Sequence, residues 1–181
     1  IRKTPILVKE CAGFLVNRLL MVYLNEAVLC LQEGNTTPDI IDREMVALGM
    51  PVGPFTLLDT IGLDISLEVA RILHTSYGPR MTPASLLEQM VLHGRLGMKS
   101  AHGFYEYGET GTVELATLIQ ENISGTHRQE TPWTPARLLM ALINEAVTAL
   151  QEGIASARDI DLAMVAGTGF PTEKEGPLHY A

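Results

Sequence analysis

The feature that most constrains this sequence is an internal repeat. The segment from residue 18 to residue 47 matches the segment from 137 to 166 in register, over about thirty positions, which chance does not produce. The matching blocks are 18–21 (RLLM) with 137–140, 25–28 (NEAV) with 144–147, 31–34 (LQEG) with 150–153, 41–42 (ID) with 160–161, and 45–47 (MVA) with 164–166. The following turn also recurs, as Gly-x-Pro and then Gly-Pro, within 49–54 and 169–177. The chain therefore contains two copies of one unit, of which the second is incomplete.

The duplication allows polar residues to be compared with their counterparts. Asn25 and Glu26 lie inside an apolar run and recur as Asn144 and Glu145. A residue kept in both copies is expected to serve the shared fold. We therefore interpret these pairs as buried hydrogen-bonding groups that hold one helix to another, in preference to acid–base groups.

Of two neighbouring positions, one is kept in both copies and the other is not. Arg18 recurs as Arg137, and an intramolecular ion pair or a contact with a backbone carbonyl accounts for it. Asn17, in contrast, is replaced by Ala136 in the second copy. An amide that one copy has and the other lacks is free to bind a ligand. Asn17 is therefore the candidate functional residue.

The spacing of apolar residues predicts helices throughout the chain. Residues 14–33 are apolar at most positions and are followed by Gly34, which suits the left-handed stop of a helix. Hydroxyl-proline pairs at Thr37, Thr82 and Thr134 predict helix starts, and Ser156 predicts another. The further helices expected are 38–48, 55–60, 63–76, 83–93, 113–123, 135–153 and 156–166, with a loop at 94–105 and a polar linker at 125–131. We expect an all-α protein.

Composition excludes several classes of protein. With 13 Lys and Arg against 21 Asp and Glu, the formal charge is −8 and the pI about 5.1, so we expect no nucleic-acid partner. Hydrophobic residues make up 46% of the chain and charged residues 19%, which favours a packed core over disorder. Polar residues at 17, 18, 25 and 26 interrupt the longest apolar run, so we expect no membrane span. Without an export signal, the expected location is the cytoplasm, or the mitochondrial matrix in a eukaryote.

Cysteine and histidine usage predicts no metal site. Cys11 and Cys30 form no CxxC pattern and no cluster with histidine, so we expect two buried free thiols. The histidines are scattered and form no catalytic pattern. They are His74, His93, His102, His127 and His179. Because the chain begins with Ile1 in place of Met, we expect it to be a piece of a longer polypeptide.

A series of motifs resembles those of one family. They are 12–20 (AGFLVNRLL), 25–27 (NEA), 49–55 (GMPVGPF) with 58–59 (LD), and 94–99 (GRLGMK) with 103–105 (GFY). In this order they resemble the C-terminal domain of 3-hydroxyacyl-CoA dehydrogenases, and the tandem copies look like the large (alpha) subunit of the fatty-acid oxidation complex. The resemblance implies a duplicated all-helical fold like the C-terminal domain of 6-phosphogluconate dehydrogenase. It implies a first copy over residues 1–108, then a linker helix and a partial second copy over 109–181.

The resemblance also implies how the chemistry is divided. In this family a preceding Rossmann domain binds NAD and supplies a His–Glu pair, the helical domain closes over the acyl-CoA substrate, and Asn17 matches the asparagine that hydrogen-bonds the substrate oxygen. No G-x-G-x-x-G follows a strand here, so we expect no cofactor in this chain and no activity from it alone. The expected partners are acyl-CoA, the missing Rossmann domain, and a second copy of the chain or a thiolase subunit.

Two further segments have competing interpretations. The glycine-rich loop at 94–105 follows a helix, which favours a turn over a phosphate cradle, with Arg95, Lys99 and His102 as the alternative anion contacts. The turn at 50–55 resembles the family turn beside the acyl chain, but core packing explains it as well.

The second copy departs from the family pattern. It carries a charged Glu-Lys-Glu run at 173–175 and lacks the asparagine, so we interpret it as structural, packing on the first copy as a dimer partner would. Two other hypotheses stand: a non-catalytic helical oligomerisation module, and the C-terminal domain of another β-hydroxyacid dehydrogenase.

Overall fold

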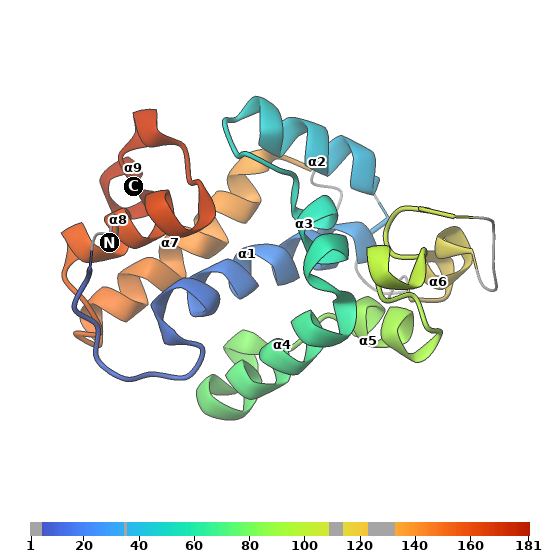
Figure 1. The fold of residues 1–181 in the computed structure, drawn as a ribbon, viewed down its shortest axis with the longest axis horizontal. Helices are drawn as coiled ribbons and strands as arrows, with labels where there is room; N and C mark the ends of the chain where they lie inside the picture. The colour runs from blue at the N-terminus through green and yellow to red at the C-terminus, as the bar shows by residue number, and fades with distance from the viewer. Residues whose placement is uncertain (1–4, 35, 109–113, 123–132) are drawn as a thin grey trace.

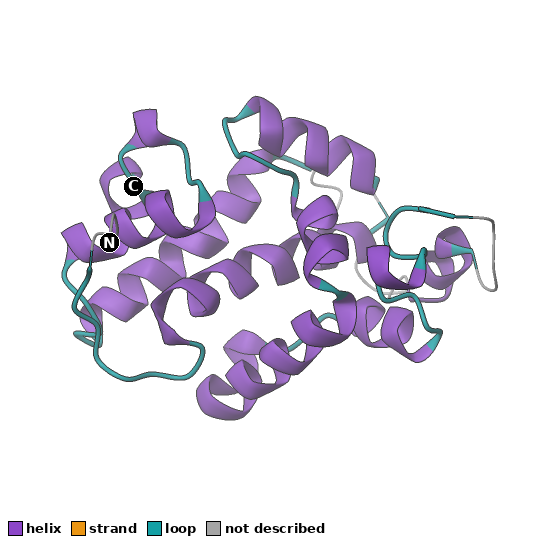
Figure 2. Ribbon diagram, viewed as in Figure 1, coloured by secondary structure: helices purple, strands orange, loops and turns teal. Residues whose placement is uncertain are grey.

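The computed structural model describes residues 5–34, 36–108, 114–122 and 133–181, and within these ranges the chain is helical with no strand (Figure 2). The predicted all-α class is confirmed. The α-helices are α1 (Phe14–Gln32), α2 (Pro38–Ala47), α3 (Pro54–Ile61), α4 (Leu63–Tyr77), α5 (Ser85–Leu92), α6 (Leu115–Asn122), α7 (Pro135–Gln151), α8 (Ala157–Thr168) and α9 (Pro177–Tyr180). Short 3-10 helices are η1 (Gly78–Met81), η2 (Met98–Ser100) and η3 (Thr172–Lys174). The expected linker at 125–131 lies outside the described residues.

The long apolar helix α1 forms the centre of the core. Its most extensive contact is with α7, the corresponding helix of the second copy, and α3, α4, α5 and α8 also pack on it (Figure 1). By its length and a mean hydropathy of 1.6, α1 has the composition of a membrane span, yet 56% of that stretch is buried inside the fold. The burial of α1 among other helices is that of a core helix.

Side-chain caps explain two of the predicted helix starts, whereas the start predicted at Thr82 is wrong. The Thr37 side chain accepts from the Ile40 amide, and the Ser156 side chain accepts from the Asp159 amide, as predicted. Thr82, however, does not start a helix, because α5 begins at Ser85. Its hydroxyl donates instead to a carbonyl in η1, so the hydroxyl-proline pair belongs to the turn before α5.

A carboxylate from α2 caps the start of α3. The N-cap of α3 is Gly53 and its first residue is Pro54, so the first free amides are those of Phe55 and Thr56. Both donate to Asp42, at 2.8 and 2.9 Å. A Cβ at Gly53 would overlap the Asp42 carboxylate, so glycine is required there.

The second copy repeats this arrangement. The Leu178 amide at the start of α9 donates to Asp161 at 2.7 Å, and Gly176 packs directly against Asp161. The recurring Ile-Asp and Gly-Pro blocks of the sequence are therefore two halves of one structural motif.

The two copies meet through reciprocal contacts. Gly49 lies against Pro171, and Gly169 lies against Pro51, so a Cβ on each glycine would come 3.1 and 2.6 Å from the facing proline ring. The exchange of equivalent residues across a contact is the property of a two-fold interface. The second copy packs on the first, as predicted, and the interface has pseudo-two-fold symmetry.

Candidate functional site

Asn17 lies on the first turn of α1 with its side chain exposed. Within the described ranges its amide has no hydrogen-bond partner. Ala136 occupies the equivalent exposed position on α7. The first copy therefore presents a free amide where the second copy presents only a methyl group.

The turn that leads to Asn17 has an unusual backbone. Gly13 has φ 73° and Phe14 has φ 48°, a left-handed conformation that a bulky residue rarely adopts. The Phe14 ring is 65% exposed, so it is not held by burial. The exposed Phe14 side chain and the exposed Asn17 amide thus both lie in the first turn of α1.

Arg18 follows Asn17 and is fully buried although it is charged. Its Nε donates to Glu145 on α7 at 2.6 Å, and its Nη1 donates to Glu152, the C-cap residue of α7, at 2.7 Å. The hydrogen bond from Arg18 holds the pKa of Glu152 below its ordinary value of 4.5. The predicted intramolecular ion pair of Arg18 exists, and it joins the two copies.

An aromatic side chain extends this network to the turn before Asn17. Cζ of Arg18 lies 4.3 Å from the centroid of the Tyr77 ring, and Cζ of Arg80 lies 4.9 Å from it. The Tyr77 hydroxyl donates to the carbonyl of Ala12 at 3.1 Å. We call these five side chains the Arg18 cluster. They are Arg18, Tyr77, Arg80, Glu145 and Glu152.

The equivalent arginine of the second copy forms a reciprocal network, the Arg137 cluster. Arg137 Nε donates to Glu26 at 2.6 Å, and Nη1 donates to Glu33 at 2.6 Å. Nε and Nη1 bond the equivalent glutamates in both copies, and Arg137 Nη2 also donates to Glu33, at 2.7 Å. The recurring glutamates therefore hold helix to helix. Glu33 and Glu152 were not among the predicted helix-joining residues, although their recurrence in the LQEG blocks was a usable signal. No counterpart of Tyr77 lies among residues 133–181, so the repeat could not identify it.

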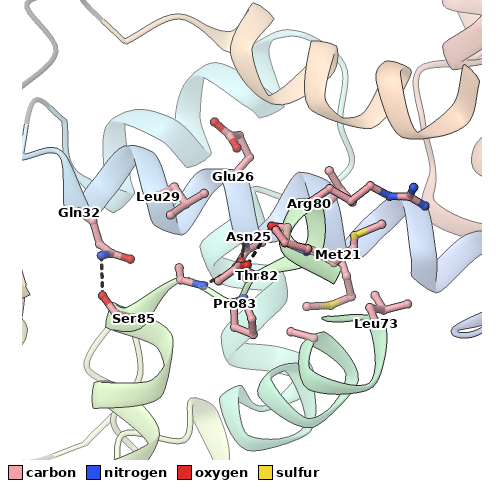
Figure 3. Close-up of a pocket in the computed structure, with 15 residues that line it drawn as sticks. Met21, Asn25, Glu26, Leu29, Gln32, Leu73, Arg80, Thr82, Pro83 and Ser85 are labelled. Carbon is pink, nitrogen blue, oxygen red and sulfur yellow. Dashed lines mark hydrogen bonds between the residues drawn. The ribbon is translucent and has the colours of Figure 1, made fainter. Parts of the chain in front are cut away.

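Asn25 serves the fold, as predicted, in the wall of a cavity of about 370 Å³ between α1 and the segment from η1 to α5 (Figure 3). Its Nδ2 donates to the Thr82 carbonyl at 3.0 Å, and its Oδ1 accepts from the Ala84 amide at 2.8 Å. Gln32 donates to Ser85 in the same wall at 2.8 Å. Both ends of the Asn25 amide are already hydrogen-bonded to the backbone of residues 82–84. This polar wall of the cavity therefore holds the turn before α5 in place.

The prediction for the counterpart residue Asn144 is wrong. Asn144 is exposed and is not a buried hydrogen-bonding group. The segment that covers Asn25, residues 78–84, has no counterpart among residues 133–181. Equal sequence therefore does not give equal burial in the two copies.

The glycine-rich loop is a turn built around one buried carboxylate. Asp59 is 1% exposed and accepts from the amides of Phe104 and Tyr105, both at 2.9 Å. Burial raises the pKa of Asp59, and these hydrogen bonds oppose the rise. Gly97 and Gly103 pack so closely on Asp59 that neither has room for a Cβ. A carboxylate fills the space that a phosphate would need, so this loop does not fit the pyrophosphate of NAD.

The basic side chains of this loop are engaged by carboxylates. Arg95 bonds Glu106 at 2.5 Å, and His102 bonds the other oxygen of Glu106 at 2.5 Å. Lys99 pairs with Asp64. The alternative interpretation of these residues as anion contacts is therefore not favoured.

The turn at 50–55 belongs to the core. Met50 and Phe55 are buried, and the Phe55 ring lies 4.6 Å from that of Phe104, centroid to centroid. Of the turn residues, Pro51 is exposed. Core packing explains this segment.

The described residues contain no group of three His, Cys, Asp or Glu side chains that could hold a metal ion. Both cysteines are free; Cys30 is buried, but Cys11 is only half-buried, so the prediction of two buried thiols holds for one of them. Burial raises the pKa of the Cys30 thiol to about 12. His127 lies outside the described ranges.

Comparisons with known proteins agree with this architecture. The chain matches the family model described as 3-hydroxyacyl-CoA dehydrogenase, C-terminal domain, over residues 13–107 and 134–180. It is 38% identical over 183 residues to the fatty acid oxidation complex subunit alpha of Shewanella amazonensis, covering 98% of this chain and 26% of that protein.

Two solved structures are similar to the chain. A 3-hydroxybutyryl-CoA dehydrogenase from Escherichia coli K12 shares the fold, with a TM-score of 0.79 at 24% identity, over 98% of this chain and 54% of that one. A (S)-3-hydroxybutyryl-CoA dehydrogenase from Ralstonia eutropha gives a TM-score of 0.57 at 43% identity, over 59% of this chain and 38% of that one.

The fold and site define an all-α domain with two reciprocally packed copies, in which the exposed amide of Asn17 follows a turn with positive φ values. The chain belongs to the family of 3-hydroxyacyl-CoA dehydrogenase C-terminal domains, and the two matched segments contain the two copies of the repeat. It spans about a quarter of the length of the curated relatives that it matches.

Proposed function

We propose that this chain is the substrate-facing helical part of an NAD-dependent 3-hydroxyacyl-CoA dehydrogenase of fatty-acid β-oxidation, which interconverts 3-hydroxyacyl-CoA and 3-ketoacyl-CoA. A separate nucleotide-binding domain holds NAD and supplies the acid–base pair. When bound, NAD takes up or delivers hydride. Family membership supports this division, and so does the glycine-rich loop that Asp59 fills. The observation that carries the proposal is the exposed amide of Asn17, which has no hydrogen-bond partner in the part of the chain that the structure describes.

In this proposal the Asn17 amide donates a hydrogen bond to the substrate oxygen on the reacting carbon. A neutral donor on a packed helix stabilises negative charge that develops on that oxygen without competing for the transferred proton. Losing such a donor costs about 3 kcal/mol of transition-state stabilisation.

We further propose that residues 1–108 form the substrate-facing copy and that residues 109–181 provide a linker helix and a structural partial copy. Acyl-CoA is the substrate, and a second chain or a thiolase subunit is the partner at the outer surface. The location is that of β-oxidation, the cytoplasm in a bacterium and the mitochondrial matrix in a eukaryote.

The test compares Asn17→Ala with Asn144→Ala in the polypeptide encoded by the complete gene. Both side chains are exposed amides on the long helix of their copy, so neither change should move the unfolding free energy by more than about 0.5 kcal/mol. We expect Asn17→Ala to lower kcat about a hundredfold and Asn144→Ala to leave it unchanged. If this domain were only an oligomerisation module, Asn17→Ala would leave the kinetics normal.

A second test uses the present chain alone. Incubation with acetoacetyl-CoA and NADH should give no turnover, because the described residues lack a nucleotide-binding fold. Substantial oxidation of NADH would refute the proposed division between two domains.

A further inference from the structure

The backbone before Asn17 requires support from its surroundings. A bulky residue at positive φ, such as Phe14 at 48°, persists only when the neighbouring structure imposes that conformation. The Phe14 ring is 65% exposed and gives little support itself. The support must therefore come from the residues that contact the turn.

Tyr77 supplies that support. Its hydroxyl donates to the Ala12 carbonyl at 3.1 Å, directly before Gly13. The Leu73 side chain, one turn earlier on α4, lies under Gly13, where a Cβ would come 2.7 Å from it. The backbone is thus fixed from the α4 side at the two residues that precede Phe14.

Tyr77 is in turn positioned by charges from the second copy. Arg18 lies 4.3 Å from the Tyr77 ring and donates to its hydroxyl at 3.4 Å. The guanidinium of Arg18 is held by Glu145 and Glu152, at 2.6 and 2.7 Å. A continuous set of contacts therefore joins α7 to the turn that presents Asn17.

We propose that Glu145 and Glu152 of the second copy are positioning residues for Asn17. The inference rests on the proposed function of Asn17 and extends it, since the second copy then contributes to substrate orientation as well as to stability. The carboxylates fix Arg18, Arg18 fixes Tyr77, and Tyr77 fixes the backbone from which the amide is presented.

The reciprocal Arg137 cluster provides a control within the same molecule. Arg137 bonds Glu26 through Nε and Glu33 through Nη1 and Nη2. The residue before it is Ala136, and no counterpart of Tyr77 is present among residues 133–181. Removing the charge of Glu33 disturbs the equivalent ion pair, which within the described residues has no contact with the turn that presents the Asn17 amide.

The experiment measures kcat and KM for acetoacetyl-CoA in the polypeptide encoded by the complete gene. The variant is Glu152→Gln, because that side chain is 38% exposed and tolerates a neutral amide of the same shape. The control is Glu33→Gln, its counterpart in the other cluster. We expect Glu152→Gln to lower kcat about tenfold with KM within about twofold, since a misplacement of about 1 Å can cost a hundredfold. Glu33→Gln should change kcat by less than about twofold.

A double-mutant cycle separates positioning from a general loss of structure. If Glu152 acts through Asn17, then Glu152→Gln should lower kcat no further in a protein that already carries Asn17→Ala. The same factor of loss in both backgrounds, or equal effects of Glu152→Gln and Glu33→Gln, would overturn the inference. An unchanged kcat in Asn17→Ala alone would instead refute the proposed function.

A second variant keeps the inference testable if Glu152→Gln does not fold. Tyr77→Phe removes the hydroxyl that bonds Ala12 and leaves both carboxylates in place. We expect it to lower kcat severalfold with KM preserved. Wild-type kcat in Tyr77→Phe would overturn the chain of contacts described above.

Discussion

The capping carboxylate of α2 offers a sharp test of how the repeat stabilises the fold. Asp42 is 8% exposed and accepts hydrogen bonds from the amides of Phe55 and Thr56, from the Thr56 hydroxyl at 2.7 Å and from the Tyr105 hydroxyl at 3.0 Å. Asp42→Asn keeps the size of the side chain. It keeps one acceptor oxygen and places an NH₂ group against the remaining donors.

The cost follows from the lost contacts. The Thr56 amide loses its acceptor inside the protein, which costs about 1–3 kcal/mol. The negative charge at the start of α3 is also lost, at about 0.5–1 kcal/mol. The two hydroxyls can rotate to accept from the new NH₂ group, so they add little. We expect a loss of about 2–4 kcal/mol in the free energy of unfolding.

The control is the same substitution at Asp161, which accepts one amide bond, from Leu178. An asparagine oxygen can still accept that bond, so Asp161→Asn should cost about 1 kcal/mol or less. Thermal unfolding followed by far-UV circular dichroism should show a decrease in Tm of about 4–16 °C for Asp42→Asn and of at most about 4 °C for Asp161→Asn. Equal decreases for the two variants would refute the reasoning from hydrogen-bond number.

Two further predictions concern titratable groups. At neutral pH a thiol reagent should modify Cys11 and leave Cys30 unmodified in the native protein, because burial raises the Cys30 pKa to about 12. Rapid modification of both thiols, or of Cys30 in a Cys11→Ser variant, would contradict this prediction. The pKa of Glu152 is lowered in the folded state by its hydrogen bond to Arg18, so its contribution to stability is complete above its unfolded value of 4.5 and is lost as the pH falls through the folded pKa. Denaturation midpoints across a pH series should therefore show the difference between wild type and Glu152→Gln shrinking below pH 4.5, whereas a constant difference would argue against this ion pair.

Local signals predicted local structure well. The hydroxyl caps at Thr37 and Ser156 marked true helix starts because a side-chain cap acts within three residues. The same signal failed at Thr82, where the Asn25 side chain binds the backbone and delays the helix to Ser85. A contact from a distant helix had decided the start of α5, and no local pattern reports such a contact.

The sequence by itself determined the helical class, the duplication and the absence from the second copy of the amide of Asn17, because these depend on short-range periodicity and on comparison of the chain with itself. Only the tertiary structure decided which charges pair. Arg18 and Glu145 are 127 residues apart, and Arg137 and Glu26 are 111 apart, so their partners are chosen by the packing of α1 on α7. That packing also connects the second copy to the turn before Asn17, a relation that spacing along the chain does not encode.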